Sequence, residues 1–250
     1  MKLRSKTKNL LYEQFHGDRR LQKRIISDKN FTYRELISII TPHLDSCKTI
    51  LDIGSGVGTI DFYLASKGKK VTGIEISKNA VDLARANAKR FFLNKHIEFI
   101  NAEFPHKITK ENYDMVIFSE VIEHLPDDKK AIHDIYSVMK PGGILIITTP
   151  TSDAPLYRMG VLKKFDKQVG HLRRYTNTGL QSLVEKNGFT VLQTGRHEGI
   201  LRNFLYTNPI AGKSIRYIKG FVSDAVTFLD KATIPLFGSS NVYIIAKKKV

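Results

Sequence analysis

The stretch from Thr49 to Gly58 (TILDIGSGVG) constrains the fold more than any other part of the chain. Its apolar, β-branched start predicts a buried strand, which ends near Asp52 and is followed by three alternating glycines. From Thr59 onward the apolar residues recur at helical spacing. A strand, a glycine turn and a helix start form a ligand cradle, because a ligand can approach the backbone where a Cβ atom would block it.

The spacing of the glycines separates two cofactor classes. The dinucleotide fingerprint needs glycine at the first, third and sixth positions, whereas here Thr59 holds the sixth, which disfavours an NAD or nucleotide-sugar enzyme. The phosphate-loop pattern is absent as well. Asp52 followed by Gly-x-Gly-x-Gly resembles motif I of the class I S-adenosylmethionine (SAM)-dependent methyltransferases. That resemblance implies SAM as cofactor, bound through a set of residues in this turn: Asp52, Gly54, Ser55 and Gly56.

Two further strand ends extend the predicted cofactor site. The segment from Lys70 to Ile76 reads as the next strand and ends in Glu75, whose carboxylate can accept both hydroxyl groups of an adenosine ribose. Glu75 and the following Ile76 are therefore predicted cofactor residues. An ordinary acidic strand end is the alternative, but the spacing from the glycines favours the ribose. The third strand, Ile97 to Asn101, ends at Ala102 and Glu103. The resemblance places these two beside the adenine, although the family's usual residue is Asp rather than Glu103.

Strands and helices alternate along the rest of the chain, which predicts a parallel sheet with helices on both faces. The resemblance implies an α/β, Rossmann-like fold with a seven-stranded, mostly parallel sheet and an antiparallel last strand. The carboxyl ends of parallel strands meet at one edge, so we expect Asp52, Glu75 and Ser119 to line one mouth. The remaining predicted strands are Tyr113 to Ser119, Ile144 to Thr149, Phe189 to Thr194 and Val242 to Lys247.

A second motif, Ser119 to Pro126 (SEVIEHLP), precedes a Pro-Gly-Gly turn at position 141. Together they resemble the methyltransferases of ubiquinone and menaquinone biosynthesis. By that likeness Ser119 and Glu120 border the methionine part of the cofactor, and His124 lies towards the acceptor. Glu120, Glu123 and His124 share one face of a helical turn, so they could bind a divalent cation. The alternative is that Glu123 and His124 hydrogen-bond neighbouring loops.

Methyl transfer to a hydroxyl group requires removal of a proton, a task that suits a histidine. The predicted catalytic residues are therefore His124 and His171, together with Glu120, which borders the cofactor. The run after His171 offers Arg173, Arg174 and Tyr175, which could bind an anionic acceptor because guanidinium groups match carboxylate and phosphate geometry. The alternative is a solvated basic loop that caps the next helix through Thr176 or Thr178.

The net charge of +16 lies on the two flanks of the chain, because basic and acidic residues cancel over 31–150. This asymmetry suggests an anionic partner: a phosphorylated or carboxylated substrate, an acidic membrane surface, or RNA. The single cysteine, Cys47, excludes internal disulfides and a cysteine-rich metal site, and fits a reducing cytoplasm. No apolar run is long enough to predict a transmembrane helix.

We expect residues 31–250 to form one domain, preceded by a basic arm or lid over residues 1–30. A helical insertion at about 199–240 separates the last two strands. Within it a set of apolar residues follows helical spacing: Ile215, Ile218, Val222, Ala225, Val226 and Leu229. This stripe predicts a helix packed on the core, or else a cover for a lipid-like acceptor that contacts a membrane at its periphery.

The sequence thus predicts a SAM-dependent methyltransferase that methylates an oxygen of a small or lipid-linked anionic acceptor. One alternative is an RNA methyltransferase, which the charge favours. The Asp/Asn-Pro-Pro-Tyr/Phe signature, the Pro-Cys nucleophile and an appended RNA-binding domain are all absent from the sequence, so nucleic acid is the less favoured partner. The other alternative is a protein that binds SAM without catalysis.

Overall fold

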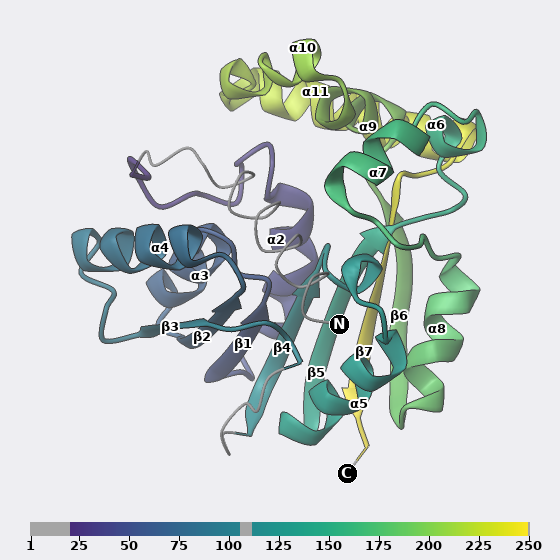
Figure 1. The fold of residues 1–250 in the computed structure, drawn as a ribbon. Helices are drawn as coiled ribbons and strands as arrows, with labels where there is room; N and C mark the ends of the chain where they lie inside the picture. Colours follow the sequence, from purple (N-terminus) through teal and green to yellow (C-terminus); the bar gives the residue numbers. More distant parts are fainter. Residues whose placement is uncertain (1–20, 106–111, 250) are drawn as a thin grey trace.

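The seven strands of the protein form one sheet, which Figure 1 shows in a computed structural model that describes residues 21–105 and 112–249. The order across the sheet is β3-β2-β1-β4-β5-β7-β6. The first five strands are parallel, and β7 is antiparallel to both neighbours. The predicted fold class is therefore confirmed. The strands are β1 (Thr49–Ile53), β2 (Lys70–Glu75), β3 (Ile97–Asn101), β4 (Tyr113–Ser119), β5 (Met139–Pro150), β6 (Phe189–His197) and β7 (Asn241–Lys248).

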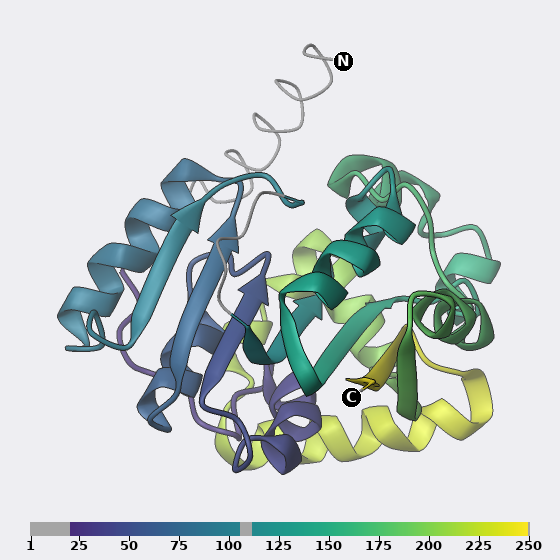
Figure 2. The ribbon, with the colours of Figure 1, turned by 90° about the horizontal axis from the view of Figure 1, so that it is seen from below.

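Helices cover both faces of the sheet, as Figure 2 shows. The alternation of side chains along each buried strand separates two apolar layers. Ile50 and Met115 pack with three helices on one face, whereas Leu51 and Val116 pack with two helices on the other. The first group is α2 (Arg34–Ile40), α3 (Thr59–Ser66) and α4 (Lys78–Arg90), and the second is α5 (Asp128–Val138) and α8 (Asn177–Lys186). Burial on both faces explains the runs of consecutive apolar residues in the central strands, such as Met115 to Phe118 in β4.

The insertion between β6 and β7 forms the upper edge of the molecule in Figure 1. It consists of α9 (Ile200–Thr207), α10 (Pro209–Gly212), a short 3₁₀ turn (Ile215–Tyr217) and α11 (Gly220–Phe237). The expectation that the apolar stripe of the insertion packs on the core is wrong for the long helix α11. The long helix begins only at Gly220, and it turns Val222 and Leu229 to the surface while Ser223, Thr227 and Asp230 are buried.

Two shorter helices, α6 (Pro155–Arg158) and α7 (Lys163–Val169), connect β5 to the loop that carries His171. Most of the predicted arm, residues 1–20, lies outside the described residues. Gln22 is described, and it binds the first face of the domain through Asn87 and Thr59. Over residues 21–105 and 112–249, none of the helices has the length and apolarity that crossing a bilayer requires.

Candidate active site

The glycine turn after β1 has the conformation that the sequence predicts. Gly54, Gly56 and Gly58 have φ angles of 82°, 54° and 83°, a region that side chains with a Cβ atom rarely adopt. At Gly54 an added Cβ would stand 2.4 Å from the Val121 side chain. The amide N–H groups of Gly54 and Ser55 both donate to the Ile74 carbonyl, which ties the turn to the end of β2.

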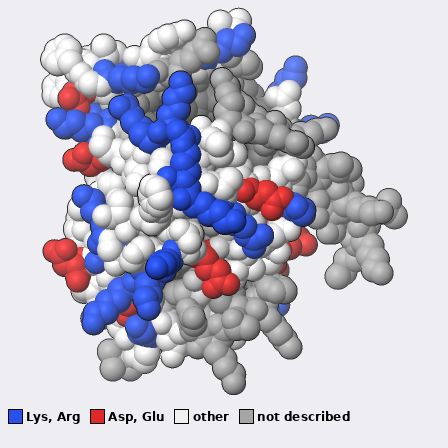
Figure 3. All heavy atoms as spheres, turned by 90° about the vertical axis from the view of Figure 1, so that its left-hand side faces the viewer, with Lys and Arg blue, Asp and Glu red and all other residues white. Residues whose placement is uncertain are grey.

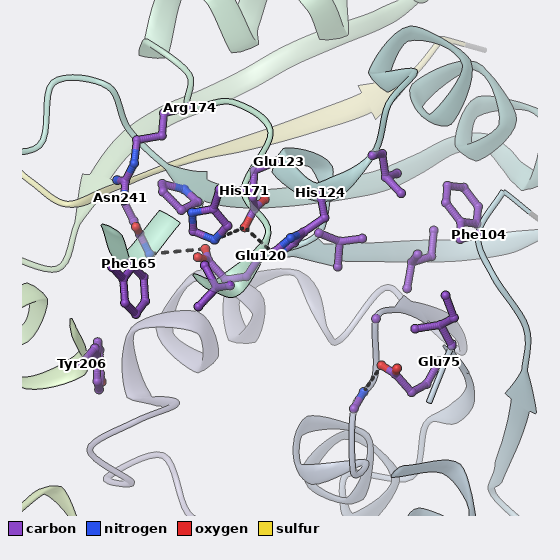
Figure 4. A pocket seen from close by; sticks show the side chains of 18 of the residues that line it. Glu75, Phe104, Glu120, Glu123, His124, Phe165, His171, Arg174, Tyr206 and Asn241 are labelled. Atoms are coloured by element: carbon purple, nitrogen blue, oxygen red, sulfur yellow. Dashed lines mark hydrogen bonds and ion pairs between the residues drawn. The ribbon is translucent and has the colours of Figure 1, made fainter. Parts of the chain in front are cut away.

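Glu75, the last residue of β2, is the best-positioned carboxylate beside this turn. It is buried, and its two oxygens accept N–H groups from Gly56 (3.1 Å) and Ser77 (2.8 Å). Each carboxylate oxygen has a second lone pair, so Glu75 can still accept hydrogen bonds from a ligand. These contacts hold the carboxylate at the wall of a cavity, where Figure 4 shows it.

The cavity measures about 390 Å³, within the size range of small-molecule sites. Its first half lies at the carboxyl ends of β1, β2 and β3. Six of the nine predicted cofactor residues line it: Gly54, Gly56, Glu75, Ile76, Ala102 and Glu103. These residues fit an adenosyl ligand, since a fixed carboxylate faces the space and glycine backbone forms its floor.

The other three predicted cofactor residues do not line this cavity. Ser55 points its hydroxyl towards Gly73, and that hydroxyl has no hydrogen-bond partner. Ser119 forms a 2.7 Å hydrogen bond with Thr148. Asp52 is buried beside Asp61 of α3. The expectation that Asp52, Glu75 and Ser119 would line one mouth therefore holds only for Glu75.

Asp52 and Asp61 form a buried carboxyl pair behind the glycine turn. Asp61 is fully buried, and no donor from another group reaches either of its oxygens. Burial raises the pKa of Asp52 to about 7, and burial together with the Asp52 charge raises the pKa of Asp61 well above its usual range. One proton shared between the two carboxyl groups satisfies both.

Replacing Asp61 with asparagine is expected to stabilise the protein by about 2 kcal/mol at pH 8. The folded chain retains a proton that the unfolded chain releases above about pH 4, so folding is penalised increasingly as the pH rises to about 7. Asparagine removes the part of that penalty that comes from placing a second carboxyl group beside Asp52, and urea unfolding at pH 5 and pH 8 measures it. Asp45→Asn, an exposed control, should leave the pH dependence unchanged. A pH dependence in Asp61→Asn equal to that of the wild type would contradict this account.

The second half of the cavity contains His171, which is held by an aspartate. The His171 Nδ1 atom lies 3.0 Å from Asp166 Oδ1, and Arg174 binds both oxygens of the same carboxylate at 2.6 and 2.9 Å. His171 and Arg174 line the cavity, and Figure 4 shows the His171 ring directed towards Glu123. Because an ionised carboxylate only accepts, Nδ1 carries the proton and Nε2 is left as a base.

Glu123 lies between two histidine rings. Its Oε1 atom is 3.8 Å from His124 Nε2 and 3.9 Å from His171 Nε2 and has no hydrogen bond, whereas Oε2 accepts from Thr149. His124 Nδ1 lies 3.2 Å from the Gly170 carbonyl, which assigns a proton to Nδ1 and a lone pair to Nε2. Three lone-pair atoms therefore converge, and a proton or a divalent cation could hold them together. Burial raises the pKa of Glu123 well above its usual range, which fits a proton there.

The predicted metal set is corrected by this geometry. Among the described residues, Glu123, His124 and His171 bring their ligand atoms within 4.8 Å of one another, and Glu120 is not one of them. Glu120 instead accepts hydrogen bonds from Thr148 (2.9 Å) and Asn241 (3.3 Å). Metal binding itself stays a prediction, which calorimetric titration with Mg²⁺ and Zn²⁺ tests.

Two glutamates face each other across Asn241 in this half of the cavity. The Asn241 amide donates to Glu120 Oε1 (3.3 Å) and to Glu198 Oε2 (3.1 Å), and all three residues line the cavity. Both glutamates have positive φ angles, 56° and 59°, which side chains adopt at a cost. Burial, reinforced by the Glu120 charge, raises the pKa of Glu198 to about 8.

The three predicted substrate-binding residues have their polar groups engaged by the protein itself. Arg173 binds Asp128 at 2.7 Å and the Pro126 carbonyl, and Tyr175 donates to the same Asp128. Neither residue lines the cavity. Arg174 does, but its guanidinium group is bound to Asp166, so it orients His171 through that carboxylate.

Sequence reasoning missed several residues of the site. Asp166 lies in α7, Glu198 follows β6 and Asn241 begins β7, and none of the three belongs to a local motif. Asn203 and Tyr206 lie on α9 of the insertion. The aromatic content of the insertion was a signal, but the side of α9 that faces the cavity depends on how the insertion folds back. Nothing in the basic sequence around His171 predicted the hydrogen bond between Asp166 and His171.

A family profile described as "Methyltransferase domain" matches residues 22–194, well over half of the chain. The chain belongs to this methyltransferase family. Its fold is that of the class I SAM-dependent enzymes, and the cofactor of the family is SAM. The predicted family, with its relatives in ubiquinone biosynthesis, is thereby confirmed.

One curated relative of this methyltransferase is the ubiquinone biosynthesis O-methyltransferase of Hydrogenovibrio crunogenus, 32% identical over 114 residues. The match covers 46% of the chain and 47% of the relative, so the chain spans about half the length of the curated relatives it matches.

Solved structures of diverse methyltransferases share the fold. Phosphoethanolamine N-methyltransferase 2 of Haemonchus contortus, in complex with SAM, has a TM-score of 0.63 at 17% identity and covers 96% of this chain and 60% of its own. Geranyl diphosphate C-methyltransferase of Streptomyces coelicolor A3(2), in complex with Mg²⁺, has a TM-score of 0.62 at 14% identity and covers 86% and 76%. Because these two enzymes methylate nitrogen and carbon, the shared fold leaves the acceptor atom undetermined.

Proposed function

We propose that this methyltransferase transfers the methyl group of SAM to a hydroxyl group of a small or lipid-linked acceptor. The observation that supports it most directly is the Asp166–His171 pair, whose Oδ1 and Nδ1 atoms lie 3.0 Å apart and whose histidine lines the cavity. A hydroxyl nucleophile needs a base within reach, and a histidine with a fixed tautomer supplies one.

Each residue of the pair has a defined task. Asp166 accepts the Nδ1 proton of His171, so that Nε2 can take the proton of the acceptor hydroxyl, and Asp166 then stabilises the imidazolium. Arg174 holds Asp166 in place from the other side. SAM, when bound, supplies an electrophilic methyl group on a sulfonium and leaves as a neutral thioether. Glu75 and the glycine turn orient it, which makes the reaction effectively unimolecular.

The acceptor half of the cavity favours a ligand rich in hydrogen-bond donors. Asn203 is nine-tenths buried and lines the cavity, and its Oδ1 atom has no hydrogen-bond partner. The carboxyl groups of Glu120 and Glu198 lie on the same cavity. All three present oxygen atoms, which suits a polyhydroxylated acceptor better than the anionic one that the sequence predicts. An anionic group on the acceptor stays a prediction.

Replacing Glu198 with glutamine is expected to raise the KM for the acceptor several-fold, because the raised pKa of Glu198 keeps its carboxyl group largely neutral and a hydrogen bond between neutral groups contributes roughly 0.5–1.5 kcal/mol. The affinity for S-adenosylhomocysteine should not change, since Glu198 lies away from Glu75. Steady-state kinetics and calorimetry measure the two quantities. Glu185→Gln, an exposed control on α8, should change neither. An unchanged KM in Glu198→Gln would remove Glu198 from the acceptor site.

The proposed reaction is tested by incubating the protein with methyl-labelled SAM and a fractionated cell extract, followed by mass analysis of labelled products. We expect the label on an oxygen atom of a small or lipid-extractable molecule. Label in the RNA fraction would replace this proposal with the RNA methyltransferase alternative. Binding of S-adenosylhomocysteine without any labelled product would support the non-catalytic alternative.

A further inference from the structure

The long helix of the insertion, α11, has its polar and apolar faces reversed relative to a helix packed on a core. Its buried residues are Ser223, Thr227 and Asp230. Large apolar residues lie at its surface instead: Phe221 (85% exposed), Leu236 (77%) and Phe228 (74%). Val222, Leu229 and Phe237 are also more than half exposed. A surface helix normally turns its apolar stripe inward, so this outer face indicates an apolar environment outside the protein.

A buried arginine fixes the orientation of α11. Arg202 of α9 is fully buried, and it donates to Thr227 at 2.7 Å and to the Phe31 carbonyl at 2.6 Å. Asp230 of α11 accepts the Arg202 backbone N–H and forms an ion pair with its guanidinium group. Rotating α11 to bury its phenylalanines would leave the Arg202 charge buried without a partner, which costs several kcal/mol. The apolar face therefore stays on the outside.

The charges around this face are positive. Both acidic residues of the insertion form ion pairs within the protein. Asp224 pairs with Arg34 at 2.9 Å, and Asp230 pairs with Arg202. Lys213 and Lys219 remain exposed before α11. Figure 3 shows Lys and Arg outnumbering Asp and Glu among the described residues of the face that includes one end of the insertion.

The segment joining α6 to α7 adds to the same edge of the molecule, since α6 packs on α9 (Figure 1). Met159 and Val161 there are 72% and 60% exposed, and Arg158, Lys163 and Lys164 flank them at the surface. Protein interfaces are depleted of lysine, whereas an apolar face bordered by lysine and arginine is typical of helices that lie in the interface of an anionic bilayer.

We propose that residues 199–240 dock this protein on an anionic lipid bilayer, with the apolar face of α11 inserted among the lipids and the neighbouring lysines on the headgroups. The inner side of the same insertion supplies Asn203, Tyr206 and Thr207 to the cavity wall. Docking therefore brings the acceptor half of the cavity close to the membrane, where a lipid-linked acceptor resides. This last step rests on the proposed function, but the docking does not.

Vesicle flotation of the full chain tests the docking. We expect the protein to float with phosphatidylcholine vesicles that contain phosphatidylglycerol and to float far less with phosphatidylcholine alone. The triple variant Phe221→Ser, Phe228→Ser, Leu236→Ser should bind at least tenfold more weakly, because it removes three large apolar side chains from the surface that the bilayer buries. The pair Lys213→Glu, Lys219→Glu should weaken binding to the anionic vesicles about tenfold.

Matched controls separate docking from folding and from catalysis. Phe92, 88% exposed after α4, is an equally exposed phenylalanine outside the insertion, and Phe92→Ser should float like the wild type. Circular dichroism and S-adenosylhomocysteine affinity should be unchanged in the triple variant, because none of its three positions lines the cavity. If the reaction proposal fails, flotation still stands.

Three outcomes would overturn the docking proposal. The first is a wild-type protein that does not float with anionic vesicles. The second is a triple variant that floats as well as the wild type. The third is a wild-type dimer in analytical ultracentrifugation that the triple variant dissolves, without vesicle binding, since a second copy of the chain would then cover α11.

Discussion

Replacing Glu75 with alanine is expected to weaken the binding of S-adenosylhomocysteine by about 100-fold or more. Glu75 is buried, and its oxygens hold the backbone N–H groups of Gly56 and Ser77. The substitution removes the acceptor for the ribose hydroxyls, and it leaves two N–H groups without their partner, each at a cost of about 1–3 kcal/mol. Isothermal titration calorimetry measures the affinity directly and needs no knowledge of the acceptor.

Glu103 provides the matched control for Glu75. It lines the same half of the cavity but is exposed, so Glu103→Ala should lower the affinity only a few-fold, as expected for a hydrogen bond that competes with water. Because Glu75→Ala also removes contacts that support the turn, its thermal unfolding should be followed in parallel. An affinity close to that of the wild type in a folded Glu75→Ala protein would show that the cofactor binds elsewhere.

Replacing His171 with asparagine is expected to lower kcat by about 10²–10⁴-fold, the usual contribution of a general base. Asparagine keeps the size and polarity of the side chain but cannot take a proton from the acceptor. The affinity for S-adenosylhomocysteine should remain within a few-fold of the wild type, since His171 lies in the other half of the cavity (Figure 4). The rate is measured on the acceptor identified by labelling.

Two further variants distinguish a base from a merely structural histidine. Asp166→Asn should lower kcat less than His171→Asn, because Nε2 remains while the preference for its tautomer is lost. His133→Asn, an exposed control on α5, should leave kcat unchanged. If His171→Asn reduced the melting temperature and cofactor affinity together with kcat, the histidine would be structural. Full activity in that variant would assign the proton to another group.

The parts of the fold and site that follow from local sequence could be predicted. A glycine at positive φ is required wherever the backbone turns tightly against a neighbouring side chain, as Gly54 does against Val121. Glu75 was predictable because a strand end at that distance from the glycines lies beside them in a parallel sheet. The apolar runs of β1 and β4 predicted a sheet covered on both faces, and their buried residues bear this out.

The direction of individual side chains could not be predicted in the same way. Asp52 and Glu75 both lie at the ends of strands, yet Asp52 turns to Asp61 in the protein interior while Glu75 faces the cavity. One residue of register exchanges the two faces of a strand, and the spacing of a motif does not carry that information. Similarly, the position of Arg173 beside His171 in the sequence suggested that it binds the substrate, although its guanidinium group forms an ion pair with Asp128.

The sequence by itself determined the order of the strands and helices, the glycine turn and the carboxylate beside it, because these depend on residues close together in the chain. Only the tertiary structure decided which polar groups meet across long separations. Asp166 with His171, Glu120 with Asn241 and Glu198, and Arg202 with α11 are brought together by packing. Most buried polar groups find a partner wherever the folded chain offers one, and the partners of Arg202 also determine which face of α11 is left outside.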